Sequence, residues 1–163
     1  MEGSFEKIYE LGKVSQRKLV AFGEELGRVL TGGETILLYG EIGAGKTTFV
    51  RGLASGLEVP EALVRSPTFN IVNTYPGRLD LIHVDLYRIH CEEEIVDLAL
   101  EDLLDDNTVM AIEWPEKYSK YVTGNSLQIH IEHVSEEERD VVLMVRDREM
   151  DLKLSILNLV SNR

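Results

Sequence analysis

The stretch TILLYGEIGAGKTTFVRGLASGL, residues 35–57, decides the fold of this 163-residue chain. It opens with a short apolar run that is typical of a buried strand, continues through a glycine-rich segment and ends in a helical pattern. Residues 40–47, GEIGAGKT, match the phosphate-loop pattern G-x-x-x-x-G-K-[ST] at every fixed position. A strand before such a loop and a helix after it are the context that this pattern requires. The stretch therefore predicts a site that holds a chain of phosphates.

The residue types of this loop suit the binding of phosphate and magnesium. Glycines let backbone N–H groups converge on a β-phosphate in conformations that a Cβ atom would obstruct, and the following helix directs its positive end to the same point. Lys46 is expected to reach the β- and γ-phosphate oxygens, and the Thr47 hydroxyl is expected to ligate magnesium. The predicted nucleotide contacts of the loop and its flanks are Glu41, Gly43, Ala44, Gly45, Lys46, Thr47 and Thr48.

The chain lacks the segments by which regulatory GTPases recognise guanine and γ-phosphate. No Asn-Lys-x-Asp follows a late apolar run, and Asp85 is followed by Leu86-Tyr87-Arg88, so it does not begin an Asp-x-x-Gly segment. ATP and Mg²⁺ are therefore the expected cofactors. This expectation rests on absence, since no segment forms a positive signature for adenine.

Two acids end apolar runs and are candidates for the carboxylates of the site. Asp85 ends LDLIHVD and Glu113 ends TVMAIE, and a magnesium site opposite Thr47 usually includes an acid at the tip of a buried strand. We assign the metal to Glu113 and the placement of the attacking water to Asp85, and the reverse assignment stays open. Lys46, Asp85 and Glu113 form the predicted catalytic set.

Three other side chains have both a functional and a structural interpretation. His83 alternates with Asp85 on one strand face, where a hydrogen-bonded histidine beside the nucleotide is favoured over a His-x-Asp metal pair. Trp114 is a candidate for stacking on the base, and a packed core tryptophan is the competing interpretation. Arg88 either contacts phosphate oxygens or pairs with the acids at residues 92–94.

Composition is that of an ordinary soluble globular protein, with 44% hydrophobic and 28% charged residues. The length suits one domain over residues 1–163. Cys91 is the only cysteine, which excludes an internal disulfide and fits a cytoplasmic location. The N-terminal residues lack the apolar core of a signal peptide, and no run approaches the roughly 18 apolar residues that a membrane span needs.

The net charge of −12 is spread unevenly along the chain. Residues 1–60 carry 7 Lys+Arg and 8 Asp+Glu, whereas residues 61–163 carry 10 and 21. Proteins that bind nucleic acid usually present a basic stripe to the phosphates, and this chain shows the reverse. Direct strong binding of RNA or DNA by a broad face is therefore not expected, and the ordinary explanation of the acidity is solubility.

Periodicity along the chain predicts an α/β domain in which a mixed sheet lies between helices, in the order α-β-α-ββ-α-β-ββ-α. The expected helices cover residues 15–30, 46–57, 92–104 and, in the C-terminal tail, part of 148–162. The expected strands lie within residues 34–40, 69–75, 79–89, 108–114, 126–134 and 140–147. The charge run SEEER at 135–139 is expected to be a solvated connection between the last two strands.

Four motifs in this order resemble the bacterial TsaE family, also called YjeE. They are GEIGAGKTTFVRG at 40–52, SPTF at 66–69, HVDLYR at 83–88 and IEWPEK at 112–117. The resemblance extends over roughly residues 15–145, and the tail after about residue 147 has no counterpart. It implies a three-layer P-loop NTPase fold of the α/β class with a mixed, largely parallel sheet.

The resemblance also implies a function. Members of the family are Mg-dependent ATPases needed to make threonylcarbamoyladenosine in tRNAs that read codons starting with A. Their partners are TsaB and TsaD, which carry the modification chemistry, so tRNA is expected to be met only indirectly and no membrane is involved. By match of motif, Thr47 and Glu113 are magnesium ligands, Asp85 is an acid of the catalytic site, and Ser66 and Thr68 lie on a nucleotide-sensing loop.

Two other functions stay open at this point. A P-loop small-molecule kinase usually clamps the transferred group with several lid arginines, and between the helix of the loop and residue 138 the chain has only Arg65, Arg78 and Arg88. A nucleotide-gated interaction module with negligible turnover is the second alternative. No arginine finger is expected beside the phosphate loop, so hydrolysis by the chain alone is predicted to be slow and to be stimulated by partner proteins.

Overall fold

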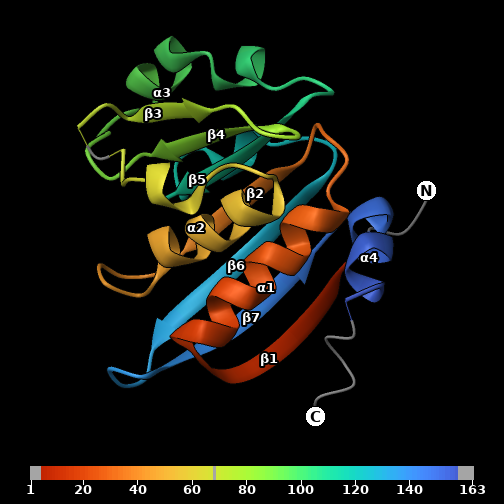
Figure 1. The fold of residues 1–163 in the computed structure, drawn as a ribbon. Coiled ribbons are helices and arrows are strands. Elements are labelled where there is room, and N and C mark those ends of the chain that lie inside the picture. The colour runs from red at the N-terminus through yellow and green to blue at the C-terminus, as the bar shows by residue number, and fades with distance from the viewer. Residues whose placement is uncertain (1–4, 68, 158–163) are drawn as a thin grey trace.

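The computed structural model describes residues 5–67 and 69–157, and these form a seven-stranded sheet with helices on both faces (Figure 1). The strands are β1 Lys7–Ser15, β2 Thr35–Tyr39, β3 Val72–Tyr75, β4 Asp80–Asp85, β5 Thr108–Glu113, β6 Ser126–His133 and β7 Glu138–Val145. The helices are α1 Gln16–Val29, α2 Lys46–Gly56, α3 Glu92–Leu98 and α4 Arg148–Ser155, and the 3₁₀ turns are η1 Glu61–Leu63, η2 Leu100–Leu103 and η3 Ser119–Tyr121. Thr68 and the end of the predicted tail helix lie outside the described residues.

The strand order across the sheet is β1-β7-β6-β2-β5-β4-β3. The four central strands, β6, β2, β5 and β4, run parallel to one another, whereas β3 at one edge and β7 and β1 at the other are antiparallel to their neighbours. This arrangement confirms the predicted α/β fold with a mixed sheet that is parallel in its centre. The carboxyl ends of the parallel strands meet at one edge, where ligands bind in folds of this kind.

Helices cover both faces of the sheet, and each face has its own apolar core (Figure 1). The larger core lies under α1, α2 and α4 and includes the fully buried Leu26, Leu53 and Leu154. The smaller core lies under α3, η2 and η3 and includes Ile95 and Leu100. Within the described residues, no helix is both long and apolar enough to span a membrane.

Helices α1 and α2 approach each other backbone to backbone because glycines face the contact. A Cβ atom at Gly52 would lie 2.2 Å from the carbonyl oxygen of Val20, which is far inside van der Waals contact. Phe22 and Phe49 add a tilted ring contact with centroids 5.7 Å apart. Helix α2, which follows the phosphate loop, is therefore held closely against the rest of the fold.

The sequence patterns locate most elements but miss the first strand. Ser15 caps α1, since its side chain accepts a hydrogen bond from the backbone N–H of Lys18, as expected. Strand β1 was not expected, because Lys7–Ser15 mixes charged and apolar residues. In the structure its register with β7 shifts between Glu10 and Gly12. This edge strand forms only because β7, far along the chain, pairs with it.

The predicted helix over residues 92–104 is also corrected. Helix α3 ends at Leu98, Ala99 takes a left-handed backbone with φ of 47°, and the 3₁₀ turn η2 follows. The break lets the turn bury Leu100 in the smaller core. Tertiary packing therefore overrides a helical pattern at this point.

Candidate functional site

The phosphate-loop segment lies between the end of β2 and the start of α2, at the carboxyl edge of the parallel strands. Gly43 and Gly45 have φ angles of 79° and 112°, a left-handed conformation that favours glycine. Gly45 is the N-cap of α2, so the positive end of this helix opens at the loop. The loop therefore has the backbone that the glycine pattern predicts.

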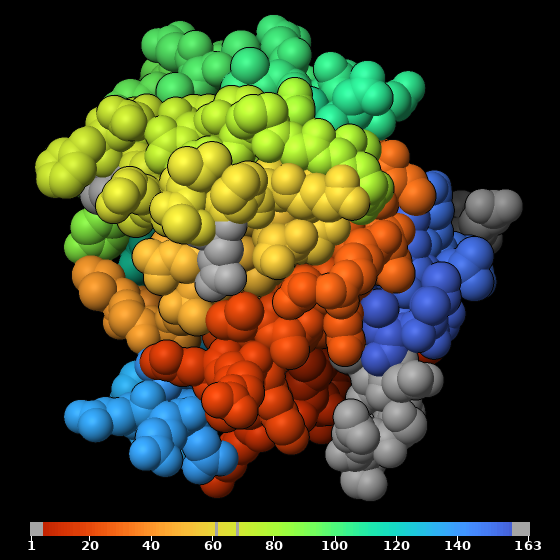
Figure 2. Space-filling view, in the orientation of Figure 1, coloured from red at the N-terminus to blue at the C-terminus, as the bar shows by residue number. Residues whose placement is uncertain are grey.

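In Figure 2 the orange phosphate loop and the blue β6–β7 turn lie along the same edge of the molecule.

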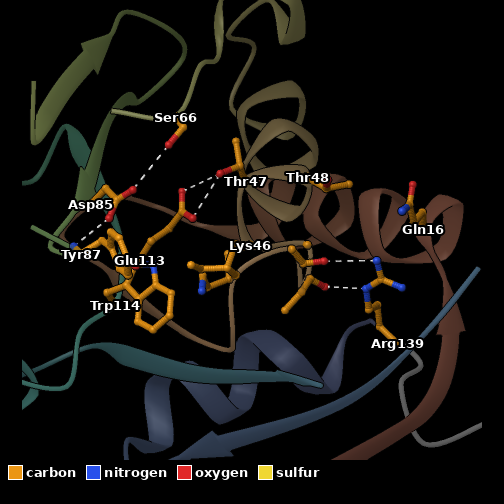
Figure 3. A pocket seen from close by; sticks show the side chains of 14 residues that line it. Gln16, Lys46, Thr47, Thr48, Ser66, Asp85, Tyr87, Glu113, Trp114 and Arg139 are labelled. Atoms are coloured by element: carbon orange, nitrogen blue, oxygen red, sulfur yellow. Dashed lines mark hydrogen bonds between the residues drawn. The ribbon is translucent and has the colours of Figure 1, made fainter. Parts of the chain in front are cut away.

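A cavity of about 360 Å³ opens at this edge (Figure 3), within the size range of small-molecule sites. It is lined by Gln16, Ile42, Gly43, Ala44, Gly45, Lys46, Thr47, Thr48, Ser66, Asp85, Tyr87, Glu113, Trp114 and Arg139. These include nearly every residue predicted to bind nucleotide or to take part in catalysis. Glu41 is the exception among the described residues, because its side chain is exposed and only its backbone carbonyl takes part, by contacting Lys46.

Lys46 is buried in the cavity wall, and no carboxylate among the described residues is in hydrogen-bond contact with it. Its Nζ donates to the carbonyl oxygens of Gly40 and, at 3.2 Å, of Glu41, and lies 3.7 Å from the centroid of the Trp114 ring. Burial lowers the pKa of Lys46, and the negative charges of Glu113 and its acidic neighbours offset this only in part. An anion that binds beside Lys46 would stabilise its charged form, so the buried ammonium group favours anion binding.

Glu113 joins the phosphate loop to the sheet. The Thr47 hydroxyl donates to both carboxylate oxygens of Glu113, at 3.1 and 2.9 Å, and the Nε2 atom of His83 lies 2.6 Å from Oε2. Both the carboxylate and the imidazole are buried. His83 is therefore a hydrogen-bonded histidine, as the sequence favoured, although its partner is a carboxylate of the site.

Asp85 ends β4 directly beside Glu113, which ends β5 in the same register. Its Oδ1 accepts a hydrogen bond of 2.9 Å from the backbone N–H of Tyr87, and its Oδ2 accepts one of 3.4 Å from the Ser66 hydroxyl (Figure 3). Asp85 thus connects the end of β4 to the segment that contains Ser66. The two acids that the sequence singled out therefore have different hydrogen-bond partners.

Trp114 lies at the rim of the cavity and follows β5 with a φ of 56°, which is uncommon for a large side chain. Its ring is half-buried, contacts Tyr87 at a centroid distance of 4.9 Å and carries the Lys46 ammonium on one face. The side chain is therefore part of the site and also packs against the smaller core. The two interpretations of Trp114 are not exclusive.

Arg139 is a residue of the cavity wall that the sequence patterns did not predict. The segment at 135–139 was expected to be a solvated run, but Arg139 is only 5% exposed. Its guanidinium donates to the carbonyl oxygens of Ala44 at 2.7 Å and Gly43 at 3.3 Å (Figure 3). The alternation of buried residues in β7 continues back to position 139, and this pattern would have placed the side chain inside.

Several other expectations about single residues are corrected or bounded. The Arg88 guanidinium lies 4.4 Å from the ring centroid of the exposed Phe69, and no contact with residues 92–94 is seen among the described side chains. No group of three or more His, Cys, Asp or Glu side chains within the described residues is arranged to hold a metal ion by itself. Magnesium bound beside a nucleotide needs only one or two protein ligands, because phosphates and water supply the others.

Comparison with known proteins agrees with this geometry. Residues 14–141 match the family described as threonylcarbamoyl adenosine biosynthesis protein TsaE. The tRNA threonylcarbamoyladenosine biosynthesis protein TsaE of Treponema pallidum is 33% identical over 129 residues, which cover 79% of this chain and 95% of the relative. The protein of the same name from a Nostoc species is 44% identical over 116 residues, 68% of either chain.

A solved structure supports the fold independently. The crystal structure of Bacillus subtilis YdiB superimposes with a TM-score of 0.71 over 99% of this chain and 100% of that one, at 24% sequence identity. At this level of identity the likeness concerns the fold alone. Taken with the family match over residues 14–141, the phosphate loop and the acids at the ends of β4 and β5 lead to one conclusion: the chain belongs to the TsaE family of threonylcarbamoyl adenosine biosynthesis proteins.

Proposed function

We propose that this protein binds ATP with Mg²⁺ and hydrolyses it in support of the threonylcarbamoyladenosine modification of tRNA. The main support for the proposal is the hydrogen-bond contact between Thr47 and Glu113 at the N-terminus of α2, with the buried Lys46 beside it. A hydroxyl and a carboxylate supply the oxygen ligands that magnesium prefers, and an ammonium group and free helix N–H groups suit the phosphates. The donor set therefore fits a magnesium nucleotide.

Each side chain has a role that follows from its contacts. Lys46 neutralises the β- and γ-phosphate oxygens, and it leaves the carbonyls of Gly40 and Glu41 to do so. Thr47 and Glu113 would hold Mg²⁺, which would supply positive charge beside the phosphates. Asp85 lies beside Glu113 and places the attacking water, because its partners, Ser66 and Tyr87, hold it at the cavity wall.

The partners that we propose are proteins of the TsaB and TsaD type. Two apolar side chains that line the cavity are exposed: Ile42 is 73% exposed and Tyr87 48%. Such residues suit contact with another protein better than contact with a polyanion. The net charge of −12 also opposes direct contact with tRNA, so tRNA is reached through the partners in the cytoplasm.

A nucleotide-gated interaction module with negligible turnover is the second candidate. It is favoured by the position of Lys46, whose ammonium group rests on the loop carbonyls and on Trp114. Nucleotide binding must reorganise these contacts, which couples the site to the exposed rim. A small-molecule kinase has less support, because the buried arginine beside the loop, Arg139, is committed to backbone carbonyls.

The test is ATP turnover by the full chain, measured alone, with tRNA alone and with TsaB- and TsaD-type proteins. We expect slow turnover alone, no stimulation by tRNA and clear stimulation by the proteins. Single-turnover measurements with the partners separate the two candidates, since the interaction module would show binding without product. Strong stimulation by tRNA alone would replace the protein-partner model with a direct RNA-acting enzyme.

A further inference from the structure

His83 is a buried polar side chain whose role the proposed function does not use. It lies in the middle of β4, is fully buried and faces the same side of the sheet as Asp85. Leu81, two residues earlier on the same face, belongs to the larger apolar core. An apolar side chain could fill this buried position. Burial of the polar imidazole costs free energy unless the ring is hydrogen-bonded, so its partners matter.

The contacts of the ring supply that reason. Its Nε2 lies 2.6 Å from Oε2 of Glu113, and Nδ1 has no hydrogen-bond partner among the described residues. An ionised carboxylate only accepts hydrogen bonds, so Nε2 carries the proton and donates it to Glu113. Among the described residues, Glu113 is therefore the hydrogen-bond partner of the His83 side chain.

Glu113 receives donors from two sides. Thr47 donates from the start of α2, and His83 donates from the neighbouring strand β4. A glutamate side chain has three rotatable bonds, and its carboxylate keeps one orientation only when other groups fix it. His83 donates from the sheet and Thr47 from the start of α2, so His83 fixes the Glu113 carboxylate independently of the phosphate loop.

We propose that His83 is a positioning residue that fixes the Glu113 carboxylate for magnesium. The proposal rests on the proposed function, in which Glu113 is a ligand of the metal. Groups that hydrogen-bond to metal-ligating carboxylates orient them, and their loss typically lowers metal affinity by about 10- to 100-fold. The predicted consequence is specific, because His83 changes the magnesium-dependent part of nucleotide affinity and leaves the remainder unchanged.

The experiment measures ADP affinity of the full chain by isothermal titration, once with Mg²⁺ and once with EDTA. The ratio of the two affinities is the magnesium increment. His83→Leu removes the donor at nearly the same volume, and His83→Gln keeps an N–H donor at a similar distance from the backbone. Val84→Ala is the matched control, because it disturbs the same strand on its opposite face, in the smaller core.

We expect His83→Leu to reduce the magnesium increment about tenfold with the EDTA affinity unchanged. His83→Gln should recover most of the increment, and Val84→Ala should retain it even though its thermal midpoint falls. In Glu113→Gln, the further change His83→Leu should have no additional effect, because the two residues act as one unit.

Three results would overturn the positioning role. They are a wild-type increment in His83→Leu, an equal loss in His83→Gln and His83→Leu, and an additive loss in the double variant. A wild-type protein without any magnesium increment would instead contradict the proposed function itself. The two failures are therefore distinguishable in one data set.

Discussion

A buried lysine from another element lies at each end of strand β2: Lys153 of α4 at its start and Lys46 of α2 at its end. The two lysines differ in their surroundings. At its start, Glu34 is fully buried and accepts hydrogen bonds from Lys153 at 2.8 Å and from the backbone N–H groups of Thr31 and Gly32. At its end, Lys46 of α2 contacts carbonyl oxygens and an aromatic face. Within residues 5–67 and 69–157, Lys153 has a carboxylate partner in contact and Lys46 has none.

The pKa directions follow this difference. Burial acts to lower the pKa of Lys153, but the hydrogen bond and charge of Glu34, with help from Glu149, outweigh it and raise the pKa. For Glu34, burial acts to raise the pKa, and the donors from Lys153, Thr31 and Gly32 lower it overall. For Lys46, burial prevails and the pKa falls. Lys153 therefore forms a structural ion pair with Glu34, whereas the burial and the lowered pKa of Lys46 fit the proposed binding of an external anion.

The largest effect is expected at the structural pair. Lys153→Met leaves the buried Glu34 carboxylate without its cation, which should cost about 3–5 kcal/mol of unfolding free energy. Urea denaturation measures this loss. Lys120→Met is the control, because Lys120 pairs with Glu92 on the surface, with side chains 55% and 54% exposed, and should change stability little. ADP affinity of folded Lys153→Met should match that of the wild type. A large loss of ADP affinity would mean that the Lys153–Glu34 pair is not separate from the nucleotide site.

Lys46→Ala should have the opposite profile. Removal of the ammonium group should lower ATP affinity or turnover about 100- to 1,000-fold, because a preorganised cation at the phosphates is lost. Thermal unfolding should show an intact fold, since no carboxylate of the described residues loses a contacting partner. Normal ATP hydrolysis by this variant would mean that the nucleotide site lies elsewhere.

The two acids separate binding from hydrolysis. Glu113→Ala should weaken magnesium-dependent nucleotide binding on the order of 10- to 100-fold, because the Thr47 hydroxyl loses its neighbour and the metal loses a ligand. Asp85→Ala should spare binding and slow hydrolysis, by about 100-fold if Asp85 acts on the water. Isothermal titration with and without Mg²⁺, followed by turnover assays, distinguishes them. The reversed pattern would exchange the two roles and leave the family assignment intact.

Arg139→Met tests whether the start of β7 supports the phosphate loop. The carbonyls of Gly43 and Ala44 lose their charged donor, and we expect nucleotide affinity to fall about tenfold as the loop loses its set conformation. Arg146→Met is the matched control, since Arg146 follows β7 and is exposed, with its Nε 3.3 Å from Oε2 of Glu6. Equal ADP titrations for both variants would show that the loop is stable without Arg139.

The smallest effect concerns pH. Because the folded pKa of Glu34 is lowered, its contribution to stability is complete above the ordinary value of 4.5 and is lost as pH falls through the folded pKa. Because the folded pKa of Lys153 is raised, its contribution is complete below 10.5 and is lost as pH rises through the folded pKa. The stability difference between wild type and Lys153→Met should therefore be level between these limits and shrink beyond either one. Urea denaturation across this range checks it, and a difference that declines near neutral pH would contradict the assignment.

Much of the fold and of the candidate site could be predicted from local pattern. The phosphate loop follows from glycine and lysine spacing, and Asp85 and Glu113 were located because each ends an apolar run. Parallel strands then bring them together, since their ends meet at one sheet edge. The first strand and the break after Leu98 could not be predicted, because their own residues only weakly favour the structure that they adopt.

The amino-acid sequence by itself determined the loop, the order of most elements and the residue types available to hold phosphate and metal. These depend on periodicity and spacing within a few residues, which the chain carries locally. Only the tertiary structure decided that Arg139 supports Ala44 across 95 residues and that Lys153 neutralises Glu34 across 119. Which charge is paired and which stays available depends on the side chains that packing brings into contact from distant segments, and no local pattern records that choice.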